Sequence, residues 1–266
     1  MNVFLRELNA YRKSTVIWCA SLSAILLIFM SLYPAFTNDV TAAKQVLEQF
    51  PETLRTALNI SLSSFFTIYG FYGYLLSFAI LAGSIQAMNI GTGIISKEVS
   101  GKTADFLLSK PMTRAQVVSA KLAAALTIIV ITNVVFAGVS YLVALMVATE
   151  KFAAGTLFLL ASTMFLVQLI FLALGALFAV LIPKIKSVIA VSMPTVFTLY
   201  IIGTLGDVLG NDKVRYLSPF KFFDTTYIIK NVSLEGKFLA IEAAIVVVAV
   251  AASYIIYIKK DVRASA

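Results

Sequence analysis

Six long blocks of apolar residues follow one another along the chain, separated by shorter polar segments. The blocks lack the 3.6-residue polar stripe of a surface helix, and each approaches or exceeds the roughly 20 residues that cross a bilayer. The expected spans cover about residues 14–33, 65–90, 122–149, 153–182, 188–205 and 238–258. The pattern therefore predicts an all-α integral membrane protein with six transmembrane helices in one domain, residues 1–266.

Residues 1–13, before the first block, place apolar and charged side chains on different sides of a helix. This predicts an N-terminal amphipathic helix lying in the membrane interface, an elbow that leads into the first span. A cleavable signal peptide is the alternative, but the apolar run is as long as a full span and lacks a clear small-x-small cleavage site. We therefore expect an uncleaved anchor.

The first connection, residues 35–64, alternates charged and apolar side chains at helical spacing. It is expected to form either short helices resting on the outer surface of the bundle or a solvated loop. Tyr69, Phe71, Tyr72 and Tyr74 follow at the outer end of the second span. Aromatic side chains at that level are typical of the interfacial belt of a membrane protein.

Composition supports the membrane assignment and narrows the chemistry. Hydrophobic residues make up 60% of the chain and charged residues 13%, against about 25% charged in a soluble domain. There is no histidine and only one cysteine, Cys19. The commonest general base and metal ligand are therefore missing, and an intrachain disulfide is impossible. We expect no bound metal, no cofactor and no catalytic residues in this chain.

The distribution of charge predicts the orientation. With six spans, the termini, the second-to-third connection and the fourth-to-fifth turn lie on one side, which carries thirteen Lys and Arg against four Asp and Glu. The other side carries eight against nine, so the net charges of +9 and −1 account for the chain's +8. The positive-inside rule places both termini in the cytoplasm of a multi-pass protein of the cell (inner or plasma) membrane. The basic balance thus reflects topology, and no nucleic acid is expected as a partner.

The cytoplasmic segment between the second and third spans, residues 95–121, is the most informative stretch of the chain. Gly101, Lys102 and Thr103 spell the end of a phosphate-binding loop, but Ser96 stands where the first glycine of that motif belongs, and no strand precedes it. A nucleotide site is therefore not expected. Phe106, Leu107 and Leu108 are three consecutive apolar residues in this segment. Exposing them is unfavourable unless a partner, or the protein's own bundle, covers them.

The same segment resembles the signature of the type-2 family of ABC transporter permeases, roughly E-x-x-x-G-T-x-x-x-L-L-S-x-P-x-x-R with a Lys opening the next span. The residues that fall on this pattern are Glu98, Thr103, Leu107, Leu108, Ser109, Pro111, Arg114 and Lys121. Gly101 lies one residue early, and Lys102 takes the usual glycine position. The six-span layout and the segment Ser218–Asp224 before the last span are also similar to that family.

The resemblance implies that Glu98 to Pro111 contains a coupling helix, which docks in a groove on a separate ATPase subunit. The expected coupling residues are Glu98, Thr103, Phe106, Leu107, Leu108, Ser109, Pro111 and Arg114. Pro111 would end that helix and Thr113 would cap the one beginning at Arg114. The implied assembly contains two copies of an ABC ATPase, which bind ATP and Mg²⁺, and a permease homodimer or a heterodimer with a related permease, surrounded by membrane lipid.

The cargo is suggested by what the spans lack. They contain almost no ionisable side chains apart from Glu242, which argues against an ion-coupled transporter. Polar residues such as Thr132, Asn133, Ser140, Thr163 and Gln168 are expected to form interhelical hydrogen bonds. An apolar, aromatic-lined route suits an amphipathic peptide, a lipid-like molecule or a hydrophobic drug, and the family resemblance implies that such a cargo is exported. The alternatives are a non-transport scaffold or sensor that recruits a cytoplasmic protein, and an intramembrane enzyme, which the missing histidines disfavour.

Overall fold

The computed structural model describes residues 3–58, 60–100 and 113–259, and all regular secondary structure within these ranges is helical. Six helices are long and apolar enough to cross a membrane, as predicted. They are α1 (Val3–Met30), α5 (Ile68–Ser100), α7 (Arg114–Val147), α8 (Ala154–Leu181), α9 (Val188–Val208) and α11 (Gly236–Lys259). The shorter elements are α2 (Tyr33–Asn38), α3 (Val40–Glu48), α4 (Glu52–Ala57), η1 (Asp212–Tyr216), η2 (Pro219–Lys221) and α10 (Thr225–Asn231).

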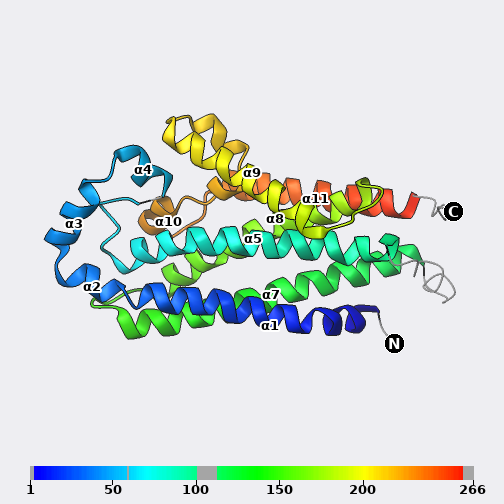
Figure 1. Cartoon of the computed structure of the whole chain (residues 1–266), viewed down its shortest axis with the longest axis horizontal. Coiled ribbons are helices and arrows are strands. Elements are labelled where there is room, and N and C mark those ends of the chain that lie inside the picture. The colour runs from blue at the N-terminus through cyan, green and yellow to red at the C-terminus, as the bar shows by residue number, and fades with distance from the viewer. Residues whose placement is uncertain (1–2, 59, 101–112, 260–266) are drawn as a thin grey trace.

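The long helices run side by side, and the start of α1 and the end of α11 lie at the same end of the bundle (Figure 1). We call this the terminal end, and the opposite end, where α2, α3, α4 and α10 gather, the distal end. The most extensive contact among the described elements is between α5 and α8. Helix α1 packs on α7, α11 on α8, and α9 on α5. Helices α5 and α8 are accordingly the most buried, whereas α9 and α11 are the least buried and expose large apolar side chains. Lipid is the solvent that such a surface requires.

The boundaries of several helices differ from those expected. Helix α1 runs without interruption through residue 13, so residues 3–13 and the first span form one helix. The reason is that no glycine or proline occurs between Val3 and Met30 to break it. Helices α5 and α7 extend well past the predicted spans, to 33 and 34 residues. Each is about 50 Å long at 1.5 Å per residue, so it exceeds the roughly 30 Å hydrocarbon core.

Two glycines let the central helices α5 and α8 approach closely. A Cβ atom added at Gly91 would lie 2.3 Å from the carbonyl oxygen of Leu172, and one added at Gly175 would lie 2.7 Å from that of Met88. Small residues at such crossings are typical of membrane helix pairs. Gly91 therefore lies inside α5 at its contact with α8.

Polar side chains connect these central helices in the middle of the bundle. Gln168 of α8 donates to the carbonyl oxygen of Gly83 at 3.0 Å, and Asn133 of α7 donates to the side-chain oxygen of Gln168 at 2.5 Å. Gln86 of α5 donates to the hydroxyl of Thr132 at 2.9 Å. The expected interhelical hydrogen bonds are thus confirmed for Thr132, Asn133 and Gln168, and also for Ser140, whose hydroxyl accepts from Tyr72 at 3.0 Å. Thr163 differs from the expectation, because its hydroxyl donates to the carbonyl oxygen of Leu160 within α8 at 2.7 Å.

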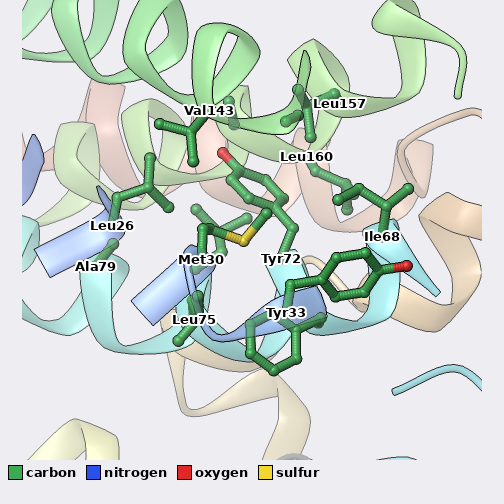
Figure 2. Close-up of a cluster of buried hydrophobic side chains, with 14 of the residues drawn as sticks. Leu26, Met30, Tyr33, Ile68, Tyr72, Leu75, Ala79, Val143, Leu157 and Leu160 are labelled. Atoms are coloured by element: carbon green, nitrogen blue, oxygen red, sulfur yellow. The ribbon is translucent and has the colours of Figure 1, made fainter. Parts of the chain in front are cut away.

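The apolar core at the distal end joins α1, α5, α7 and α8 (Figure 2). Tyr72 lies at its centre and is fully buried, with Met30 beside it, and Phe71 is only 3% exposed. The interpretation of Phe71 and Tyr72 as members of the interfacial belt was therefore wrong. The reason is that Tyr72 points into the bundle, where it meets Ser140 of α7, and that Phe71 packs against the Tyr33 and Phe36 rings of α2. The alternation in residues 35–64 had left open whether short helices form there.

Candidate functional site

The predicted coupling segment is only partly described by the structure. Thr103, Phe106, Leu107, Leu108, Ser109 and Pro111 lie outside the described residues. Glu98 belongs to the last turn of α5, and Arg114 begins α7. The described part of the site therefore consists of the last turn of α5 and the first turn of α7, which flank residues 101–112 at the terminal end of the bundle. We call these two turns the frame.

The return into α7 is fixed by a capping box. The Thr113 hydroxyl accepts from the backbone N–H of Gln116 at 3.2 Å, and the Gln116 side chain accepts from the backbone N–H of Thr113 at 3.0 Å. Two otherwise unpaired N–H groups at the start of α7 are satisfied in this way. The prediction that Thr113 caps the helix starting at Arg114 is confirmed.

A buried lysine joins three helices just inside this frame. Lys121 of α7 is 2% exposed, and its Nζ donates to the carbonyl oxygen of Ile94 in α5 at 2.6 Å. The same Nζ lies 3.3 Å from Oε1 of Glu7 in α1. A buried cation is tolerated only when it is paired and hydrogen-bonded, and both conditions are met here. The ends of α1, α5 and α7 are thereby held in fixed register.

Lys97 extends this junction toward the solvent. Its Nζ lies 4.0 Å from Oε2 of Glu7 and 3.8 Å from the centre of the Tyr11 ring, and its side chain is half-exposed. Such an exposed pair contributes little to stability by itself. It nevertheless places a second contact between α1 and the last turn of α5, immediately before the undescribed segment.

The C-terminal end of α11 completes the frame. The Arg114 side chain donates to the carbonyl oxygen of Ile258 at 3.3 Å. The Tyr254 hydroxyl donates to the carbonyl oxygen of Ala115 at 3.2 Å and lies 3.0 Å from the Ser119 hydroxyl. Both helices that flank residues 101–112 are therefore anchored: α5 to α1, and α7 to α1 and α11. A force applied to the segment would reach most of the bundle through these contacts.

Replacing Lys121 by Met is expected to lower the free energy of unfolding by roughly 3 kcal/mol, because the buried Glu7 carboxylate and Ile94 carbonyl lose a partner. Lys97→Met is the matched control and should cost less than about 1 kcal/mol, since that pair is half-exposed. Thermal unfolding of the purified chain in detergent measures both. Equal melting temperatures for the two variants would contradict a structural role for the Lys121 junction.

Sequence reasoning placed Lys121 on a family pattern but missed its partner, because Glu7 lies 114 residues away and was assigned to an interfacial helix. One feature of the sequence could have indicated this ion pair, since Glu7 is the only acidic residue among the first 38 residues. Among the residues that the structure describes, no group of three or more His, Cys, Asp or Glu side chains could hold a metal ion.

Comparison with known proteins adds one finding. The family model described as ABC-2 family transporter protein matches residues 1–262, nearly the whole chain. No curated protein matches the sequence.

Proposed function

Because the chain belongs to the ABC-2 family of transporter proteins, we propose that it is the permease subunit of an ATP-driven exporter, coupled to a separate ATPase through residues 98–111. The family match over residues 1–262 is the observation that carries the proposal. The six apolar helices agree with a multi-pass membrane component. ATP hydrolysis is then the task of the partner, and the chain supplies the path and receives the force.

The terminal end is proposed to face the cytoplasm. The side that includes this end carries thirteen Lys and Arg against four Asp and Glu, and the distal side carries eight against nine. This asymmetry favours a cytoplasmic terminal end by the positive-inside rule. Phe106, Leu107 and Leu108 would then be presented to a cytoplasmic ATPase as apolar anchors, with Lys102, Asp105 and Lys110 as a polar rim.

Force would pass through the two helices that flank the coupling segment. Closure of the two ATPase subunits on ATP displaces residues 98–111, and α5 and α7, each about 50 Å long, carry that displacement across the membrane. The Lys121 junction transmits it to α1, and the Arg114 and Tyr254 contacts transmit it to α11. ATP binding thereby shifts the equilibrium between inward- and outward-facing bundles.

The complete transporter is proposed to contain two permease chains related by a two-fold axis and two ATPase subunits. A homodimer is our first choice, and a heterodimer with a related permease has the same geometry. The apolar faces exposed by α9 and α11 are available for lipid and for a second permease. The cargo is an amphipathic peptide, a lipid-like molecule or a hydrophobic drug, because the described spans offer apolar surface and few ionisable groups.

Co-purification of the full chain with an ABC ATPase from the same genome tests this function. We expect a stable complex, faster ATP hydrolysis than by the ATPase alone, and ATP-dependent accumulation of an amphiphilic fluorescent probe in inverted vesicles. If every ABC ATPase of the genome fails to bind the chain, and ATP drives no accumulation, the proposed function is wrong.

A further inference from the structure

Two cavities adjoin at the distal end, beneath the short helices α3 and α4. The first has a volume of about 280 Å³, and its walls come from α1 to α5. Apart from Arg55 and Tyr74, its lining is entirely hydrocarbon, including Phe36, Leu47 and Phe50. The second has a volume of about 300 Å³ and is mostly polar. Its polar lining residues are Thr56, Ser61, Ser64, Tyr74, Asp207, Thr225 and Thr226.

The two cavities share walls. Ile60 and Tyr74 line both, and the consecutive residues Arg55 and Thr56 line the apolar and the polar cavity respectively. The apolar cavity and the polar one therefore lie next to each other. Each volume alone is near the lower limit for a small-molecule site, about 300 Å³, and the two together lie within the usual range. We propose that they form one binding site for a single-chain phospholipid, with the acyl chain in the apolar cavity and the headgroup in the polar one.

Arg55 specifies an anionic group on this ligand. Its Nε is buried, and no described residue accepts a hydrogen bond from it. A buried donor without an acceptor is costly, and a guanidinium is suited to phosphate oxygens. A lipid phosphate beside Arg55, at the boundary between the cavities, would satisfy this donor.

The polar cavity specifies the other end of the headgroup. Its single charged residue is Asp207, whose carboxylate pairs with Lys221 and is accompanied by the hydroxyls of Ser and Thr residues. These groups accept hydrogen bonds from an ammonium or a hydroxyl. A phosphate at Arg55 followed by an amine near Asp207 describes an ethanolamine headgroup. The small apolar volume favours one acyl chain over two.

This binding site deepens the proposed function. It rests on that function only where the bound lipid is taken to be cargo on the exit side of the membrane. Binding itself requires no ATPase. A transport defect with intact binding would therefore count against the exporter alone, whereas intact transport without binding would count against this site alone.

Quenching by a brominated lipid tests the site on the full chain in detergent. Phe50 lines the apolar cavity and is 44% exposed, so Phe50→Trp in a Trp18→Phe background provides a local reporter. The probe is lysophosphatidylethanolamine with bromine on its acyl chain, added below its micelle concentration. We expect saturable quenching, and Arg55→Gln should weaken binding about tenfold. Lys44→Gln removes a cation from α3 that does not line the cavity, and binding should be unchanged.

A brominated monoacylglycerol with the same chain separates the headgroup from the tail. It should bind about tenfold more weakly than the phospholipid, and Arg55→Gln should not weaken it further. Three results would overturn the site: quenching that does not saturate, equal affinities for the Arg55→Gln and Lys44→Gln variants, or an equal effect of Arg55→Gln on both probes. Quenching that is lost as the chain dimerises would indicate a second copy in the cavity and would overturn it as well.

Discussion

Leu107→Asp is expected to uncouple the permease from its ATPase, with complex formation weakened by at least about thirtyfold and stimulated hydrolysis lost. Apolar anchors at the centre of an interface contribute about 2 kcal/mol or more each, and burying a carboxylate in place of a leucine adds a desolvation cost. Co-purification and ATPase assays on the complex measure the two effects. The six-span bundle itself should remain folded, because the change lies in the connection between α5 and α7.

The matched control for this variant is Leu209→Asp. Leu209 follows α9 at the distal end and is 75% exposed. The same chemical change is made there, at the opposite end of the bundle from the coupling segment. Wild-type complex formation is expected for Leu209→Asp. A stable and stimulated complex in the Leu107→Asp variant would rule out coupling through this residue.

Gly91→Ala is expected to prevent stable assembly of the bundle, although it adds only one methyl group. Its Cβ would lie 2.3 Å from the carbonyl oxygen of Leu172, a backbone atom that cannot rotate away. Helices α5 and α8 must separate to accommodate it, and they form the most extensive contact of the described fold. Overpacking of this kind costs typically 1 to 3 kcal/mol, and we expect at least about 3 because the obstacle is backbone.

Gly138→Ala is the control for this effect. Gly138 lies within α7, and nothing lies within 4 Å of an added Cβ there. Alanine is the better helix former, so stability should be unchanged or slightly higher. Thermal unfolding in detergent compares the two variants, and size-exclusion chromatography reports aggregation. If Gly91→Ala melts within a degree or two of Gly138→Ala, the close crossing of α5 and α8 does not exist.

The spans were predictable because each depends on local composition. A block of apolar residues forms a helix in lipid whatever its neighbours are, since every backbone hydrogen bond must be made within the segment. The cap at Thr113 was predictable for the same reason, as its partner Gln116 is three residues away. Features encoded within one turn of helix or one span are therefore readable from the sequence.

Contacts between distant segments were not predictable from the same information. Nothing near Lys121 indicates that Glu7 pairs with it, and nothing near Gly91 indicates the carbonyl of Leu172. The burial of Phe71 depends on α2, whose Tyr33 and Phe36 rings contact it, and residues 35–64 fitted a solvated loop nearly as well. The two distal cavities likewise exist only because helices α2 to α4 return over α5.

Labelling of a cysteine at position 107 tests most directly whether the coupling segment faces an ATPase in the cytoplasm. The variant is Leu107→Cys with the native Cys19 replaced by serine, and the reagent is a membrane-impermeant maleimide. Rapid labelling is expected in inverted vesicles, with at least tenfold protection when the ATPase is bound. Labelling only from the outer face of intact cells, or an unchanged rate with the ATPase bound, would contradict coupling through residues 98–111.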